Sequence, residues 1–162
     1  GDFNRKGTSI FSGKIGENPL GMPNNIFPFI TNVARGNISK LQIYGNDWPT
    51  NDGTGIRDYV HVTDLASAHI SALEYLRKYS KNLILNLGSE NGFSVLEILK
   101  KTKQIINIDI PYQIEQRRKG DVKKVVSSCS LAKNILKWEK KYSDLDTIIK
   151  STWQIYNKKN IL

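Results

Sequence analysis

Segments with the period of a helix alternate along this chain with short apolar segments, and this alternation constrains the fold more than any other feature. Apolar residues recur every three or four positions in the first kind and form compact runs in the second. We expect strands at residues 41–44, 56–62, 83–87 and 108–114. We expect helices from Pro23 to Gly36, from Thr63 or Asp64 to Leu76, after Ser94, from Ser130 to Trp138, and from about Asp144 to Tyr156. Helices that alternate with strands define the α/β class.

Start and stop signals support several of these boundaries. Proline is tolerated in the first turn of a helix, which suits Pro23, and glycine is favoured just after the last turn, which suits Gly36. Ser94 and Glu97 have the spacing of a capping box, in which each side chain bonds to the other residue's backbone N–H. The 162 residues are enough for one domain with a hydrophobic core.

Residues 44–62, YGNDWPTNDGTGIRDYVHV, join a long polar loop to the start of a strand. The first half is rich in Gly, Asn, Asp and Pro, which are the residues that form turns. Arg57 stands where the loop becomes the strand. Nothing in the residue types explains why the loop is so long.

Arg57 has a counterpart in the run Arg117-Arg118-Lys119-Gly120-Asp121, which follows a predicted strand. The planar guanidinium group donates two parallel hydrogen bonds to a phosphate, so two arginines from separate elements could clamp a diphosphate. Alternatively, Arg57 pairs with Asp58 or Asp64, and the two adjacent arginines are solvated. Residue types alone favour the second interpretation.

The net charge of +9 lies entirely in the last third of the chain, because basic and acidic residues balance as far as Leu99. A basic surface can bind nucleic acid, bind an anionic substrate, or simply aid solubility. Most of these lysines fall on the exposed side of predicted helices, so we interpret them as a solvated surface.

Several kinds of site are missing from the sequence. It contains no G-x-G-x-x-G, no P-loop and no Tyr-x-x-x-Lys pair, which are the signatures of dinucleotide binding, phosphate binding and short-chain-dehydrogenase chemistry. His61, His69 and Cys129 have no zinc-site spacing. We therefore interpret His61 as a packed structural histidine and predict no metal and no catalytic residue in this chain.

The compartment is predicted from the single cysteine and from hydropathy. Cys129 cannot form a disulfide within the chain, which favours a reducing, cytoplasmic location. No run approaches the length of about 20 apolar residues that a membrane helix needs. The chain starts with Gly1 rather than Met, and we expect it to begin inside a larger protein.

Four stretches together resemble the carboxy-terminal half of UDP-glucose 4-epimerases, which are extended short-chain dehydrogenase/reductase enzymes. The stretches are GENPLGMPNN, KLQIYGNDWPTNDGTGIRDYVHVTDLASAH, NLGSENGFSVLEI and RRKGDV. The likeness runs from Phe3 almost to the end of the chain and is weakest in the last part. It implies an NAD-dependent isomerase that interconverts UDP-glucose and UDP-galactose in galactose metabolism, homodimeric when complete.

The resemblance also implies roles for individual residues. Phe3 lies near the nicotinamide of NAD and Asn4 bonds to the sugar nucleotide. Pro23-Asn24-Asn25 places Asn24 and Asn25 at a helix N-terminus, where free N–H groups favour the diphosphate, and Ile26 lines the nucleotide site. Gln42, Ile43 and Tyr44 offer backbone groups and one aromatic ring to uracil. Arg57 and Arg118 hold the diphosphate, and Asp121 accepts hydrogen bonds from the ribose hydroxyls.

Val125 occupies the position that limits the sugar pocket in the family. A bulky residue there restricts the pocket, and a small one admits N-acetylated hexoses. Valine is intermediate in size, so we predict that UDP-N-acetylhexosamines are accepted as well.

The sequence departs from the family pattern at its start, where Asp2 replaces an aromatic residue and Arg5 follows Phe3-Asn4 in place of proline. The amino-terminal half, with the dinucleotide fingerprint and the Tyr/Lys pair, is missing. We therefore expect residues 1–162 to form a small mixed substrate-binding domain plus edge elements of a Rossmann-type sheet whose main part is absent. Such a chain should be inactive alone and only marginally stable, because strands near Phe3 and at residues 83–87 would lack their neighbours.

Two other interpretations stay open. The chain could belong to another extended enzyme acting on nucleotide sugars, such as a decarboxylase or dehydratase, although GNDWPTNDGTG argues against this. The lysine-rich last third could instead form a basic nucleic-acid-binding module, although it contains no recognised motif. Binding to oligonucleotides would depend steeply on salt, whereas saturable UDP-sugar binding would not.

Overall fold

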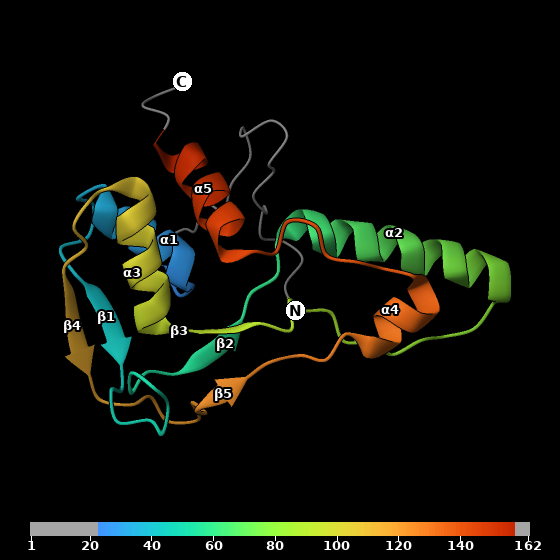
Figure 1. The fold of residues 1–162 in the computed structure, drawn as a ribbon, viewed down its shortest axis with the longest axis horizontal. Helices are drawn as coiled ribbons and strands as arrows, with labels where there is room; N and C mark the ends of the chain where they lie inside the picture. The colour runs from blue at the N-terminus through green and yellow to red at the C-terminus, as the bar shows by residue number, and fades with distance from the viewer. Residues whose placement is uncertain (1–22, 158–162) are drawn as a thin grey trace.

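The computed structural model describes residues 23–157, and Figure 1 shows their arrangement. The helices are α1 (Ile26–Ala34), α2 (Val62–Tyr79), α3 (Val95–Ile106), α4 (Ser130–Leu136) and α5 (Leu145–Tyr156). The strands are β1 (Leu41–Tyr44), β2 (Ile56–Asp58), β3 (Gly92–Ser94), β4 (Tyr112–Glu115) and β5 (Lys124–Val125). The α/β class is confirmed. No helix within residues 23–157 is both long enough and apolar enough to cross a membrane.

The strands form two small sheets. β1 and β4 are parallel, with Leu41 opposite Tyr112 and Tyr44 opposite Glu115. In the second sheet β2 is central, antiparallel to β3 and parallel to β5. Parallel neighbours need a long connection, so each parallel pair here brings together residues far apart in the sequence.

Two hydrophobic clusters lie at opposite ends of the molecule (Figure 1). The larger one joins α1, α3 and α5 to β1, and its buried members include Ile30, Ile43, Ile98 and Ile149. The smaller one lies between α2 and α4 and is built on Ala68, Cys129, Ala132 and Trp138. β2 lies between these two groups of helices in Figure 1.

Several predicted boundaries are confirmed. β1 matches its prediction, the Ser94–Glu97 capping box starts α3, and Asp144 caps α5 by accepting a hydrogen bond from the Thr147 N–H. The predicted start of α1 is wrong, because the helix begins at Ile26 after Asn25. Pro28, rather than Pro23, therefore occupies the first turn, where its missing N–H leaves no helical bond unmade.

The strand predicted at residues 56–62 is too long. β2 ends at Asp58, and His61 rather than Thr63 or Asp64 caps α2, because its Nδ1 accepts a hydrogen bond from the Thr63 N–H at 3.1 Å. The His61 side chain is buried, and its backbone N–H donates to Ser143 Oγ at 2.9 Å. Burial lowers the pKa of His61, although Asp64 and Asp144 oppose this effect. The prediction of a packed structural histidine is confirmed.

The strand predicted at residues 83–87 is not formed within the described part of the chain. Its residues nevertheless alternate in burial: Leu83, Leu85 and Leu87 are partly covered, while Ile84 is 96% exposed. One side of the segment packs on the smaller cluster, and on the other side none of the strands formed by residues 23–157 pairs with it. A run of apolar residues interrupted only by Asn86 therefore did not mean burial on both faces of this segment.

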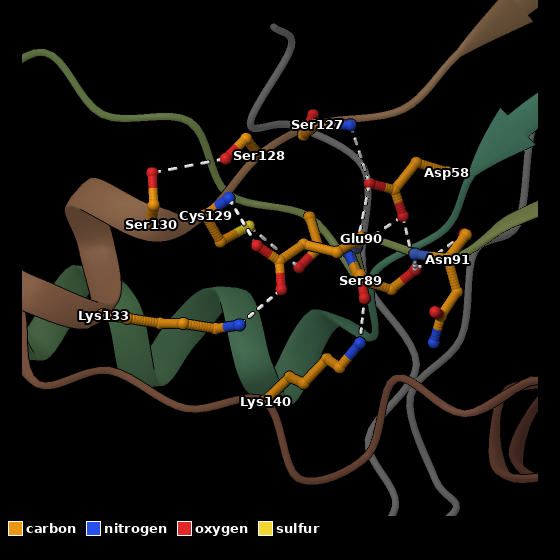
Figure 2. A network of polar contacts seen from close by, with 11 residues as sticks. Asp58, Ser89, Glu90, Asn91, Ser127, Ser128, Cys129, Ser130, Lys133 and Lys140 are labelled. Carbon is orange, nitrogen blue, oxygen red and sulfur yellow. Dashed lines mark hydrogen bonds and ion pairs between the residues drawn. The ribbon is translucent and has the colours of Figure 1, made fainter.

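A polar network fixes the far end of this segment to β2. Asp58 accepts hydrogen bonds from the backbone N–H groups of Ser89 and Ser127, at 2.8 and 3.1 Å, and from the Ser89 hydroxyl (Figure 2). Next to it, Glu90 accepts from the Cys129 N–H at 2.9 Å and pairs with Lys133. The carboxylate of Asp58 therefore binds within the fold, one residue after Arg57.

Candidate functional site

A cavity of about 500 Å³ opens where the start of α1, strand β1, the end of β2 and the 118–121 turn meet. Its wall contains most of the predicted site residues. These are Asn24, Asn25, Ile26, Gln42, Ile43, Tyr44, Arg57, Arg118 and Asp121. Residues separated by almost a hundred positions in the sequence are thus brought to one place by the parallel pairing of β1 with β4 and of β2 with β5.

Two guanidinium groups in this cavity face the same carboxylate. Arg57 Nη2 lies 3.8 Å from Asp121 Oδ1, and Arg118 Nε lies 3.3 Å from Asp121 Oδ2. The interpretation in which Arg57 pairs with Asp58 or Asp64 is wrong, because both of those carboxylates bind backbone groups elsewhere. Two positive charges against one negative charge leave the cavity suited to an anion.

Backbone oxygens hold the Arg57 side chain in place. Its Nη1 donates to the carbonyl oxygens of Ile56 and Val122, at 2.9 and 2.8 Å. The side chain is about one-third exposed, so these bonds fix a guanidinium group that still reaches the cavity. An arginine held in this way loses little side-chain freedom when it binds a ligand.

Strand β1 supplies an aromatic wall. The Arg118 guanidinium lies over the Tyr44 ring, with Cζ 4.3 Å from the ring centre, and the Tyr44 hydroxyl donates to Gln42 Oε1 at 2.7 Å. Ile43 is buried in the larger cluster, so only its backbone can face a ligand. Within residues 23–157 β1 has β4 on one side only, which leaves the backbone groups of its other edge toward the cavity.

The first turn of α1 forms another part of the wall, because Asn25 and Ile26 both line the cavity. The first backbone N–H groups of a helix lack partners within the helix, and the helix dipole makes this end attractive to anions. The helix end and the two arginines thus favour the same kind of ligand.

Of the predicted site residues that the structure describes, Val125 does not line this cavity. Phe3 and Asn4 lie outside the described residues. Val125 lies on β5, opposite Arg57 in the register of the sheet, and is 49% exposed. Its side chain is thus beside the Arg57 strand but is not part of the cavity lining that the described residues form.

The cavity also contains residues that the sequence did not predict. The aromatic ones are Phe27, Phe29, Trp48 and Tyr59. Burial raises the pKa of Tyr59 to about 12 against the opposing charge of Arg57, so its phenol is protonated at neutral pH and can donate a hydrogen bond. Tyr59 could have been found from the sequence, because it lies two positions after Arg57 and so on the same side of an extended chain. Trp48 gave no such signal, since it lies in an irregular loop.

The long loop before β2 is held by Asp52. Its Oδ1 accepts from the backbone N–H and the hydroxyl of Thr54, at 2.9 and 2.8 Å, and its Oδ2 accepts from the Ser94 hydroxyl at the start of α3. Gly53 has φ +79°, and a Cβ there would lie 2.0 Å from the Asn46 carbonyl oxygen, so only glycine fits. The loop spans the distance from β1 to α3 and back to β2, which accounts for its length.

Asp52 should make the stability of this loop depend on pH. Burial acts to raise its pKa, but the hydrogen bonds from Ser94 and Thr54 outweigh burial and hold it below the usual 3.8. A lowered pKa in the folded state gives stability that is present above pH 3.8 and lost as pH falls below it. We expect Asp52→Asn to lower the free energy of unfolding by about 1 kcal/mol at pH 7, and by less at pH 3. Urea denaturation at both pH values measures this; an equal loss at both would contradict the role of the carboxylate.

No group of three or more His, Cys, Asp or Glu residues within residues 23–157 is placed to hold a metal ion. The cavity is lined by two arginines, the start of α1 and aromatic rings. Groups of these kinds suit a phosphorylated ligand with a planar ring.

Comparisons with known proteins agree with this geometry. The family model described as GDP-mannose 4,6 dehydratase matches residues 11–152. A UDP-glucose 4-epimerase of Pasteurella multocida is 44% identical over 92% of this chain, and the one of Homo sapiens is 41% identical over 98% of it. This chain spans 44% of the length of each of these relatives.

Solved structures give the same result. A UDP-glucose-4-epimerase from Stenotrophomonas maltophila, with bound NAD and formylated UDP-arabinopyranose, superposes with a TM-score of 0.88 at 39% identity. A UDP-glucose 4-epimerase from Bifidobacterium longum, in complex with NAD+ and UDP, superposes with a TM-score of 0.85 at 35% identity. The matches cover 94% and 96% of this chain, but 45% of each solved chain.

Proposed function

The chain belongs to the family described as GDP-mannose 4,6 dehydratase, and from this premise we propose that it is the UDP-sugar-binding part of a UDP-glucose 4-epimerase. The epimerase is chosen over a dehydratase because the relatives and solved structures compared above are epimerases. In the complete isomerase, UDP-glucose and UDP-galactose are interconverted by oxidation and reduction at C4 with NAD. The described residues would hold the UDP that anchors the sugar during that exchange.

The observation that carries the proposal is the convergence of Arg57 and Arg118 on Asp121 inside one cavity. A diphosphate placed between the two guanidinium groups would replace their contact with the carboxylate by stronger, bidentate bonds. Asp121 would then be free to accept hydrogen bonds from the ribose hydroxyls. Uracil would lie against Tyr44 and the open edge of β1, with the phosphates near Asn25 at the start of α1.

NAD does not fit the residues of this chain alone. The sequence has no glycine-rich dinucleotide loop and no Tyr-x-x-x-Lys pair. Phe3, which the resemblance places beside the nicotinamide, lies outside the described residues. We therefore assign no step of hydride or proton transfer to this chain, and propose that a separate amino-terminal part binds NAD and carries out the chemistry.

The apolar surface around α2 is where that amino-terminal part would dock. Ile70, Leu73, Leu76 and Tyr79 on α2 are 42–60% exposed, and Ile84 on the neighbouring segment is 96% exposed. The alternating burial of residues 83–87 is that of a strand with one face covered. A sheet edge alongside would cover Ile84 and complete the backbone hydrogen bonds of this segment.

Titration of the chain with UDP tests the proposal. We expect saturable binding of UDP and UDP-glucose, with weak dependence on salt, measured by calorimetry. A single-stranded oligonucleotide serves as the control, since a basic nucleic-acid-binding module would bind it with a steep salt dependence. Oligonucleotide binding without UDP binding would overturn the proposal in favour of that module.

The size of the residue at position 125 should set the choice of sugar. We expect a complete enzyme that carries this chain to turn over UDP-N-acetylglucosamine as well as UDP-glucose. Val125→Tyr should reduce the first activity by about tenfold or more, because a bulky ring would clash with the acetamido group, and should spare the second. Robust turnover of UDP-glucose beside zero turnover of UDP-N-acetylglucosamine in the unchanged enzyme would contradict this.

A further inference from the structure

Arg117 and Arg118 are adjacent in the sequence but do different things in the structure. Arg118 lines the cavity and lies over Tyr44, whereas Arg117 does not line it. Arg117 instead turns to the loop that leaves β1. Neither the sequence motif nor the proposed function gives this arginine a role.

Arg117 makes three contacts with that loop. Its Nε lies 2.6 Å from Asp47 Oδ1, and its Nη2 donates to the Asp47 carbonyl oxygen at 2.5 Å. Its guanidinium also lies over the Trp48 ring, with Cζ 3.8 Å from the ring centre. Trp48 is itself part of the cavity wall, so Arg117 contacts a wall residue without lining the cavity.

These contacts lie where β1 and β4 end. The last bond between the two strands is donated by the Gly45 N–H to the Glu115 carbonyl oxygen at 2.8 Å. A Cβ on Gly45 would lie 2.7 Å from Arg117 Cγ and 2.9 Å from Trp48 Nε1, so the three residues are closely packed. Beyond this point the segments that follow β1 and β4 separate, and the Arg117 side chain joins them through its hydrogen bonds to Asp47.

We propose that Arg117 is a positioning residue, which joins the ends of β1 and β4 so that Arg118 is held over Tyr44 and faces the diphosphate. The inference rests on the proposed function, because it concerns the affinity for UDP. The guanidinium group is needed for its shape as well as its charge, since it donates to two oxygen atoms of Asp47, one of the side chain and one of the backbone, while it lies over the Trp48 ring.

The expected results separate positioning from direct binding. Arg117→Ala should weaken UDP binding about tenfold, and Arg117→Lys should not restore it, because lysine keeps the charge but loses the fork and the stacking. Affinity for uridine, which has no phosphates, should change less than twofold in both variants. In a chain that already carries Arg118→Ala, Arg117→Ala should lower UDP affinity little further, because the effects of two residues that act through one another are not additive.

Lys119→Ala is the matched control, since it removes one positive charge from the same turn and Lys119 does not line the cavity; we expect UDP affinity to stay within twofold. Asp47→Ala provides a second variant if Arg117→Ala fails to fold, because Asp47 is 69% exposed, and it should weaken UDP binding in the same direction. If Arg117→Lys binds UDP as well as the unchanged chain, or if the fold-losses in UDP affinity from Arg117→Ala and Arg118→Ala multiply in the double variant, Arg117 acts through its charge and the positioning role is wrong.

Two further outcomes separate this inference from the proposed function. If the unchanged chain binds UDP and Arg117→Ala binds it equally well, the inference alone is wrong. If the unchanged chain binds no UDP, the proposed function fails with it.

Discussion

Arg57→Ala is expected to weaken UDP binding by about a hundredfold, which corresponds to roughly 2.7 kcal/mol. The size follows from the loss of charge-assisted hydrogen bonds to the diphosphate, each of which is worth about 1.5–3 kcal/mol. Arg57 is already held by the Ile56 and Val122 carbonyl oxygens, so its removal also takes away a guanidinium group that is fixed in place before the ligand binds. Calorimetric titration with UDP measures the effect.

Two controls make this result specific. Arg77→Ala removes the same charge from the exposed last turn of α2, away from the cavity, and should leave UDP affinity unchanged. Affinity for uridine should change little in Arg57→Ala, since the nucleoside has no phosphates to lose. Equal losses for UDP and uridine would indicate that Arg57 supports the fold rather than the ligand.

Asp64→Ala is expected to have the largest effect on stability, lowering the free energy of unfolding by about 3–5 kcal/mol. Asp64 is 2% exposed, and its carboxylate accepts from the Lys141 and Tyr142 N–H groups at 3.0 and 2.9 Å and from the Ser143 hydroxyl at 2.5 Å. Alanine would leave these buried donors without a partner. Because the total stability of a small domain is only about 5–15 kcal/mol, much of the variant should be unfolded in water.

Urea denaturation followed by circular dichroism measures this loss. Asp64→Asn should lower the free energy of unfolding by less than Asp64→Ala, because the amide oxygen can still accept some of the three hydrogen bonds. The matched control is Asp146→Ala in the first turn of α5, where the carboxylate is 43% exposed and pairs with Lys101; such a pair contributes about 0–1 kcal/mol. Similar losses for Asp64→Ala and Asp146→Ala would contradict the role given to Asp64.

The parts of the fold that were predicted correctly from the sequence are those determined by residues close together in the chain. The Ser94–Glu97 capping box, the start of the last helix at about Asp144 and the run of β1 depend on residues within a few positions of one another, and all three are confirmed. β5 was missed because its two residues become a strand only by pairing with β2, which is far away in the sequence. The exposure of Ile84 was missed for the same reason, since it depends on what lies beside the segment.

The candidate site was predicted in a similarly uneven way. Residue types alone favoured Arg57 as a surface residue, whereas the resemblance to a family identified it as a residue that binds the diphosphate. Neither identified Asp121 as the carboxylate that Arg57 and Arg118 share, because that contact depends on the parallel pairing of β2 with β5. The role of Asp52 in fixing the loop before Arg57 also needed the structure, since its partner Ser94 lies on another element.

The central claim is that one cavity binds UDP between α1, β1 and the two arginines, and nuclear magnetic resonance of the isotopically labelled chain tests it most directly. On titration with UDP, we predict saturable shifts in the backbone amide signals of Ile43, Tyr44, Arg57 and Arg118, with Asn25 and Ile26 at the start of α1 following the same curve. Absence of shifts, or shifts confined to the lysine-rich surface of α3, would contradict the account.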